Sequence, residues 1–257
     1  MVDRFRVHYH YNAGVSIACN NNLYIFNYWQ GEEETLPTQA SIQDADFTNY
    51  QNVFVFVCND RSDILDPIIY TWQKHANVQY ICSADASLHT QCIALKPQQY
   101  HVLCEGVVVQ AHESTDKGIC FSLSIDNLNI FNAGTFNLWH WMEISNLDEI
   151  NNAQISFENI LSQLPKNDIT LAIFPLDVRQ GLHYEAGAVQ YISRTKPRFF
   201  MPVRYLNRGD IVNTFARDYT NLHTTVLPFI KPGSFADFYL ENEKWHMSGI
   251  QLKNADD

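Results

Sequence analysis

Residues 130–141 read IFNAGTFNLWHW, and this stretch decides the fold. Its first part continues a meander of strands, because Asn129 to Asn132 follows a turn expected at residues 126–127. From Gly134 to Trp141 aromatic side chains crowd one short segment, which is expected to form an aromatic-rich loop. The stretch therefore predicts a strand that delivers an ordered loop to the edge of a sheet.

Strands dominate the chain before this loop, and the pattern after it is mixed. Period-two alternation or a short continuous apolar run predicts strands at residues 5–11, 14–19, 23–29, 53–57, 78–82, 100–103, 107–111 and 119–125. The later elements are a helix ended by Pro165, a strand at 169–174, a helix at 184–193 and a strand at 199–203. Residues 32–49 are polar and acidic and are expected to form a loop or lid. This order favours a single domain, residues 1–257, made of two sheets with helices outside.

A second informative segment spans residues 53–70. An apolar strand leads into a polar loop, Asn59 to Asp66, and a helix is expected to open at Pro67, where proline suits the first turn. Within this loop, residues 59–64 read NDRSDI. Three shorter segments read STDKG at 114–118, LDVR at 176–179 and FMPVRY at 200–205.

Together these segments resemble the metallo-β-lactamase superfamily. The loop at 59–64 is similar to its His-x-His-x-Asp-His metal-binding loop, and residues 130–141 resemble the Ile-Phe-His-Ala-Gly-Asp-Leu-Asn-x-Trp-His-Trp segment of a bacterial subgroup. The three shorter segments resemble its Ser-Thr-Asp-x-Gly turn, its Val-Asp-Pro-Arg segment and its Val-Pro-Met-His-Phe strand end. The resemblance runs from about Val7 to Tyr205 and implies an α/β fold, the αββα four-layer sandwich with two mixed sheets flanked by helices.

The resemblance also marks where metal ligands are expected, and most of them are replaced. In the first loop only Asp63 matches a ligand. The replaced positions are Asn59, Arg61, Ile64, Thr135 and Arg204. Zinc needs about four N, S or O ligands, and an arginine about 4 Å from a divalent cation opposes its binding by several kcal/mol at a dielectric constant of about 20. We therefore expect a degenerate site without a metal cofactor, which cannot activate water for hydrolysis.

The former active site leaves a set of candidate pocket residues with two interpretations. These residues are Asn59, Arg61, Asp63, Thr135, His140, Asp177, Arg179 and Arg204. One interpretation is that Arg–Asp salt bridges have replaced the metal as glue between the two halves. The other is an anion pocket in which arginine forks bind a carboxylate or phosphate. Asp177 and Arg179 are expected to form an ion pair at the rim, and His140 an aromatic clamp with Trp139 and Trp141.

A rewired metal site is the alternative. Its weak candidate ligands are Asp63, His112 and Asp116, and it would use zinc or another divalent cation to hydrolyse a phosphodiester, a lactone or a related ester. His8 and His10 point the same way from one strand and could also bind metal, although a solvated strand face is the simpler interpretation.

Charge and composition exclude several classes of function. The formal net charge is −11 and no basic patch is present, which argues against nucleic acid and anionic membranes as partners. No apolar run reaches the ~18 residues of a transmembrane helix, and the start of the chain lacks a signal-peptide pattern. The six cysteines include no Cys-x-x-Cys pair and are expected to be free buried thiols, so we expect a reduced, cytoplasmic location.

The sequence thus predicts a cytoplasmic bacterial protein with a degenerate metallo-β-lactamase-like site. Its expected role is to bind a small anion or to act as a scaffold. A third possibility is an oligomer partner that regulates an active paralogue.

Overall fold

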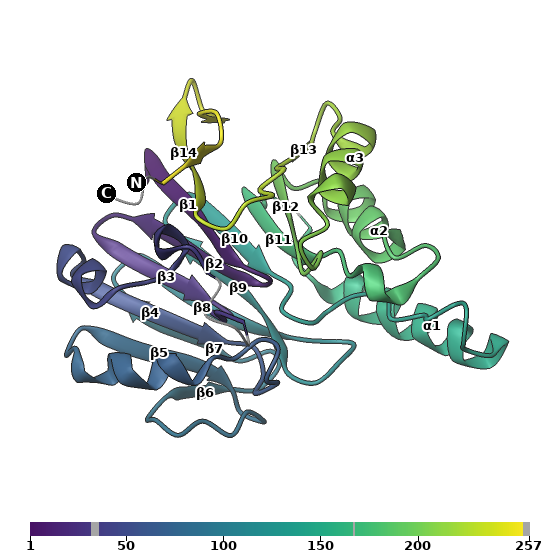
Figure 1. Cartoon of the computed structure of the whole chain (residues 1–257), viewed down its shortest axis with the longest axis horizontal. Helices are drawn as coiled ribbons and strands as arrows, with labels where there is room; N and C mark the ends of the chain where they lie inside the picture. Colours follow the sequence, from purple (N-terminus) through teal and green to yellow (C-terminus); the bar gives the residue numbers. More distant parts are fainter. Residues whose placement is uncertain (32–35, 167, 254–257) are drawn as a thin grey trace. The chain divides into compact units, whose positions relative to one another are not determined.

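The computed structural model describes residues 1–31, 36–166 and 168–253. Its backbone contacts divide the chain into two compact units, residues 1–95 with 229–257 and residues 96–228. Each unit is built on one mixed sheet (Figure 1). The loop or lid expected at residues 32–49 falls partly on residues 32–35, which lie outside the described residues, and 3-10 helices occupy Thr38–Ala40 and Asp44–Asn49.

The sheet of the first unit has nine strands in the order β15-β14-β1-β2-β3-β4-β5-β6, with β16 paired to β14. The strands are β1 (Arg4–Tyr11), β2 (Gly14–Cys19), β3 (Asn22–Phe26), β4 (Asn52–Val57), β5 (Val78–Ser83), β6 (Ile93–Leu95), β14 (Ser234–Glu241), β15 (Lys244–Met247) and β16 (Gln251–Leu252). The strands from β3 to β6 run parallel and the remaining pairs are antiparallel. Residues 53–57 are buried on both faces, which explains their continuous apolar sequence.

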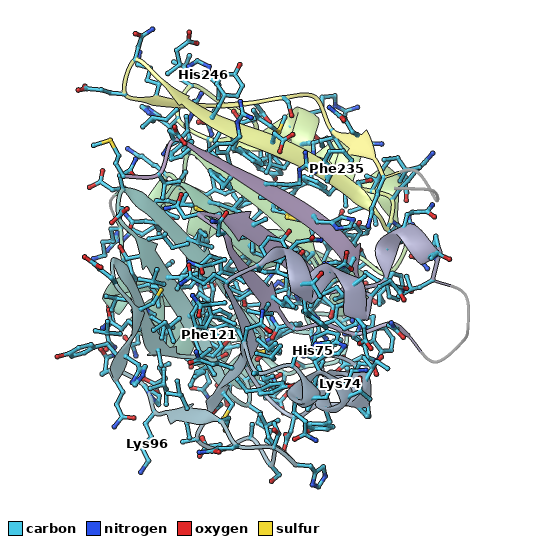
Figure 2. All side chains as sticks on the ribbon, turned by 90° about the vertical axis from the view of Figure 1, so that its left-hand side faces the viewer. Lys74, His75, Lys96, Phe121, Phe235 and His246 are labelled. Atoms are coloured by element: carbon cyan, nitrogen blue, oxygen red, sulfur yellow. A yellow bond between two sulfur atoms is a disulfide. The ribbon has the colours of Figure 1, made fainter. Side chains whose placement is uncertain are left out.

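Two 3-10 helices, η2 (Asp44–Asn49) and η3 (Pro67–Lys74), pack on one face of this sheet. Phe47 of η2 and Trp72 of η3 have ring centroids 5.3 Å apart, in a core that includes Val55. Figure 2 labels Lys74 at the end of η3. Its side chain forms an ion pair with Asp44 at the surface, and this pair joins the two helices. The helix predicted from Pro67 is therefore present, although with 3-10 geometry.

The sheet of the second unit has seven strands in the order β13-β12-β11-β10-β9-β8-β7. The strands are β7 (Tyr100–Cys104), β8 (Val107–Glu113), β9 (Ile119–Ile125), β10 (Leu128–Asn132), β11 (Leu171–Pro175), β12 (Phe199–Val203) and β13 (Thr225–Val226). The strands from β10 to β13 run parallel, and those from β7 to β10 are antiparallel. The unit also holds the helices α1 (Leu147–Gln163), α2 (Ala186–Thr195) and α3 (Gly209–Tyr219).

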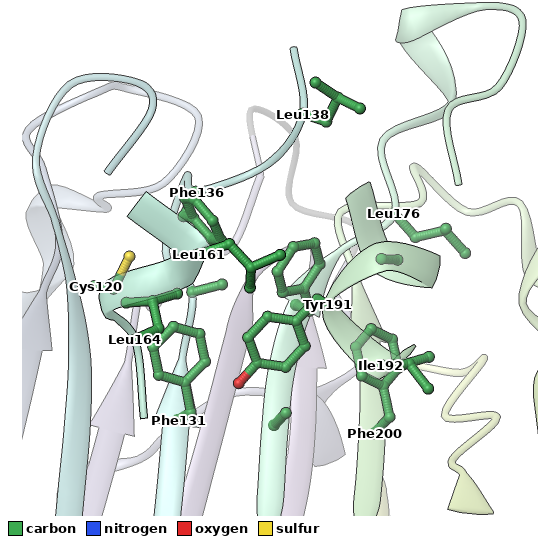
Figure 3. Close-up of a cluster of buried hydrophobic side chains, with 14 of the residues drawn as sticks. Cys120, Phe131, Phe136, Leu138, Leu161, Leu164, Leu176, Tyr191, Ile192 and Phe200 are labelled. Carbon is green, nitrogen blue, oxygen red and sulfur yellow. The ribbon is translucent and has the colours of Figure 1, made fainter. Parts of the chain in front are cut away.

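An aromatic core fixes these helices on the second sheet (Figure 3). Phe131, Phe174 and Phe200 come from the neighbouring parallel strands β10, β11 and β12. Tyr191 of α2 stacks on Phe131 with ring centroids 5.2 Å apart, and Phe157 of α1 and residues of α3 complete the cluster. The core therefore holds the carboxyl ends of β11 and β12 in fixed register, and these ends carry the candidate site.

The start of α1 is capped by its own sequence, and this supports a first prediction. The Asn146 side chain accepts the backbone N–H of Glu149, whose carboxylate accepts the Asn146 N–H in return. Replacing Asn146 with Ala should lower the free energy of unfolding by about 1 kcal/mol in urea titrations. Asn151→Ala, at an exposed position inside the same helix, is the control and should not destabilise. An equal loss in both variants would contradict the capping argument.

Two sequence predictions are wrong in the first unit. Cys82 and Cys92 form a disulfide, with Cα atoms 6.4 Å apart, because the parallel pair β5 and β6 brings them together. The prediction that all six cysteines are free thiols therefore fails for these two. His8 and His10 do not lie on a solvated face, because His10 is only 1% exposed beneath the segment around Ala40.

The boundaries of the predicted elements hold in most places. The aromatic-rich loop follows β10 as expected, and the helix expected at 184–193 begins at Ala186. The sequence analysis did not identify β6, α3, β13 or the strands β14 to β16. None of the helices in the described part of the chain is long and apolar enough to span a bilayer.

Candidate functional site

A buried carboxylate lies just beyond the end of β11. Asp177 is 0% exposed and caps the short 3-10 helix η4 (Val178–Gln180) by accepting the backbone N–H of Arg179 at 3.1 Å. The guanidinium group of Arg179 also donates to both carboxylate oxygens, at 2.8 and 2.5 Å. Such fork-to-fork pairing is the strong geometry for an Arg–carboxylate pair. The ion pair predicted between Asp177 and Arg179 is confirmed.

A second guanidinium group approaches the same carboxylate from the end of β12. The parallel pairing of Pro175 with Val203 brings the ends of β11 and β12 to one edge of the sheet. Arg204 follows directly, with a left-handed backbone (φ 63°) and only 1% exposure. Its Nη2 atom lies 3.6 Å from Oδ2 of Asp177. Two guanidinium groups therefore face one buried carboxylate.

The aromatic loop is fastened by Thr135. Thr135 is fully buried, and its hydroxyl donates to the carbonyl of Lys117 at 2.9 Å. The Trp139 ring N–H donates to the carbonyl of Thr135 at 2.8 Å, and the rings of Trp139 and Trp141 stack with centroids 6.1 Å apart. Since its hydroxyl proton is used within the loop, Thr135 acts here as a structural residue.

The same loop lies against the segment that follows η4. His140 Nε2 is 3.0 Å from the carbonyl oxygen of His183. At the start of α2, a Cβ atom on Gly187 would lie 2.0 Å from Oδ1 of Asn137, so only glycine permits this close approach. His140 therefore joins the loop to the backbone of His183, and its clamp with the tryptophans stays a prediction.

Three buried side chains of these two segments have polar atoms without a hydrogen-bond partner among the described residues. They are Nδ2 of Asn137, Nδ1 of His140, and both Nε2 and Oε1 of Gln180. Buried polar atoms are nearly always hydrogen-bonded in folded proteins, so each needs a partner such as water or a ligand. The sequence analysis did not single out Asn137 or Gln180, although both lie within or beside the motif segments.

The loop that resembles the metal-binding motif lies in the first unit and forms its own ion pair. Arg61 Nε donates to Oδ1 of Asp63 at 3.1 Å, and both side chains are partly exposed. Asn59 is fully buried, and its side-chain oxygen accepts the backbone N–H of Arg61 at 3.1 Å. Ile64 is also buried, in keeping with its apolar side chain.

The weak metal candidates have other partners. His112 is buried on β8, its Nε2 lies 2.7 Å from the Ser122 hydroxyl, and burial lowers the pKa of its imidazole to about 4. The backbone N–H of Asp116 donates to the Ser114 hydroxyl at 3.4 Å. Within residues 1–31, 36–166 and 168–253 no three His, Cys, Asp or Glu side chains gather in a group that could hold a metal ion.

The donors that are present do not fit a divalent metal centre. The two aspartates of the candidate set, Asp63 and Asp177, are each paired with an arginine of their own unit. Arg204 adds a further permanent positive charge beside Asp177, and a cation bound there would be repelled by it. No catalytic step through a metal is therefore derived from these residues.

Comparison with known proteins identifies similar structures but no relative in sequence. No protein-family model matches the chain, and no curated protein matches it in sequence. The chain is similar in structure to a metallo hydrolase from the archaeon Ignicoccus hospitalis, with a TM-score of 0.65 and 13% identity over 93% of this chain and 100% of that one. It is also similar to the metallo-β-lactamase fold protein YhfI from Bacillus subtilis, with a TM-score of 0.56 and 9% identity over 91% and 99%.

A third similar structure is the isothiocyanate hydrolase from Delia radicum gut bacteria, with a TM-score of 0.52 and 9% identity over 86% of this chain and 95% of that one. These likenesses span nearly the whole of each solved chain. The protein therefore has the metallo-β-lactamase fold, an α/β architecture with two mixed sheets flanked by helices, as the resemblance of residues 130–141 implied.

Proposed function

We propose that this chain is a cytoplasmic bacterial binding protein that holds a small anion and is not a metal-dependent hydrolase. The observation that carries the proposal is the pair of guanidinium groups, from Arg179 and Arg204, around the single buried carboxylate of Asp177. Arginine forks match carboxylate and phosphate oxygens, so two of them side by side favour an anionic ligand.

Several neighbouring groups support the same function. The unpartnered amide nitrogens of Asn137 and Gln180 offer further donors beside the Asp177 segment. In this proposal Asp177 orients the two arginines, and Arg204 and Gln180 contact the ligand.

Metal content and catalysis test the first half of the proposal. Full-length protein purified without chelator should contain far less than one equivalent of zinc, manganese or iron by elemental analysis. It should also leave phosphodiester and lactone substrates unhydrolysed. Near-stoichiometric metal that is lost in Asp63→Asn or His112→Gln would instead establish the hydrolase with rewired ligands.

Anion binding tests the second half. Inorganic phosphate, with acetate as the carboxylate probe, should bind in calorimetric titrations, and Arg204→Lys should weaken binding of the better probe about tenfold, or ~1.4 kcal/mol. Gln180→Leu should weaken it as well while the protein stays folded by circular dichroism. Arg208→Lys is the matched control, because Arg208 forms an exposed ion pair with Asp210 in the same unit.

The outcomes of this titration separate binding from a purely structural role. Equal losses in Arg204→Lys and Arg208→Lys would point to nonspecific screening and contradict the proposal. The absence of binding by both probes would leave the arginines as salt bridges of a scaffold.

A further inference from the structure

A cavity of about 290 Å³ lies in the first unit, apart from every residue of the proposed anion site. Its floor is the face of β1 that carries Arg6, His8 and His10. The segment around η2 contributes Tyr50 and Asp46, and β14 contributes Phe235, which Figure 2 labels. The volume is close to the lower end of the roughly 300–1,000 Å³ typical of small-molecule sites.

The two histidines are neutral and held in a defined arrangement. His10 has both ring nitrogens occupied, by the carbonyl of Ala40 at 2.7 Å and the hydroxyl of Ser16 at 2.8 Å. The His8 ring packs beside it with centroids 4.6 Å apart. Nε2 of His8 is buried and has no hydrogen-bond partner among the described residues. A buried ring nitrogen of this kind needs a partner that the protein itself does not provide.

The charges at the cavity favour an anion. Arg6 is already neutralised by a bidentate pair with Asp237, at 2.8 and 2.9 Å. Lys253 lines the cavity and forms no ion pair within the described residues. Asp46 is the acidic residue of the lining, and its carboxylate accepts the backbone N–H of Gln43 at 2.7 Å.

The pKa of His8 agrees with this reading of the charges. Burial is the largest cause that lowers the pKa of His8 to about 4, and the positive charge of Lys253 is the second. The carboxylate of Asp46 raises this pKa, with a smaller effect. Lys253 also lowers the pKa of His10, after burial and His8.

The walls of the cavity favour a ligand with a flat, apolar part. Phe235 and the His8 ring meet at 85° with centroids 6.5 Å apart, and the Arg6 guanidinium covers the Phe235 ring at 4.5 Å. Leu23, Ile42 and Tyr50 add apolar surface to the lining. Aromatic rings in such walls bind flat ligands through edge and face contacts.

We infer that this cavity binds a small aromatic carboxylate, with its carboxylate at Lys253 Nζ and its ring beside His8 and Phe235. The binding involves no covalent step and no proton transfer. This site is independent of the proposed anion site, since none of its residues belongs to the second unit.

Phenylacetate is the probe that tests this site in the full-length protein. It should bind in calorimetric titrations, whereas phenethylamine, with the same ring and a positive charge, and acetate, without a ring, should bind at least tenfold more weakly. Lys253→Met should weaken phenylacetate binding at least tenfold. Lys244→Met, which removes an exposed lysine of the same sheet, is the matched control and should leave the affinity unchanged.

Imidazole ¹⁵N spectra give a readout that does not depend on a variant folding. Addition of phenylacetate should shift the Nε2 resonance of His8 and leave that of the exposed His101 in place. Arg204→Lys should not change the affinity for phenylacetate, which separates this site from the proposed anion site. Equal binding of phenethylamine, an unchanged affinity in Lys253→Met, or an unmoved His8 resonance would each overturn the inference.

Discussion

Replacing Asp177 with Asn should lower the free energy of unfolding by about 3–5 kcal/mol, because it removes a negative charge beside a buried guanidinium group. Arg204 is almost fully buried and lies 3.6 Å from the carboxylate, so water cannot compensate for the lost charge. The asparagine keeps the shape of the side chain and its ability to cap η4. The loss would therefore measure charge rather than packing. Urea titrations followed by circular dichroism are the measurement.

The matched control for this variant is Asp210→Asn. Asp210 also forms a bidentate pair with an arginine, at 2.9 and 2.8 Å, yet its side chain is 65% exposed. Exposed pairs contribute little, so this variant should differ only slightly from the wild type. The double variant Asp177→Leu/Arg204→Met should recover much of the loss, since it removes both charges together. A similar stability of Asp177→Asn and Asp210→Asn would refute this account.

Acidification from pH 7 to pH 5 should destabilise the protein by roughly 2 kcal/mol for each deeply buried histidine with a folded-state pKa of about 4. His8 and His112 have such values, chiefly because burial disfavours the imidazolium form, and burial shifts the pKa of His10 in the same direction. The unfolded chain titrates near pH 6.5 and binds more protons than the folded chain between these values. Stability is therefore lost as the pH falls below 6.5.

Single variants show which histidine causes the loss of stability between pH 7 and pH 5. His112→Asn should reduce the loss between pH 7 and pH 5 by about one histidine's share, roughly 2 kcal/mol. His101→Gln removes an exposed imidazole on the neighbouring strand and serves as the control. Urea midpoints at pH 5, 6 and 7 provide the data. A stability that rises toward pH 5, or a slope untouched by His112→Asn, would contradict burial of neutral rings.

Local patterns predicted much of this fold. The continuous apolar run at residues 53–57 and the alternation in β1 each correspond to strands, because parallel central strands and half-buried strands leave those signatures. The short strands β6, β13 and β16 escaped notice because two or three residues carry no period. α3 begins at Gly209 after five residues outside regular structure, 204–208, and no capping side chain marks its start.

The candidate site was predictable in part. The Asp177–Arg179 pair follows from two residues in one short turn, so the local sequence could indicate it. The disulfide between Cys82 and Cys92 depends on the pairing of β5 with β6, and sequence spacing does not reveal such a pairing. The burial of His8 and His10 likewise depends on Ala40 and Phe235, which are remote in the chain. Alternation identified their common face and could not show what covers it.

During synthesis of the chain, one edge of the first unit's sheet stays unpaired until late. β1 is complete once residue 11 has left the ribosome, but its partner β14 begins at Ser234, so some 220 residues must follow before the pair can form. Until then one side of β1 exposes N–H and C=O groups that could pair with a strand from another nascent chain. The second unit, residues 96–228, has all of its strands earlier. Slow translation after residue 228 should therefore favour aggregation through β1.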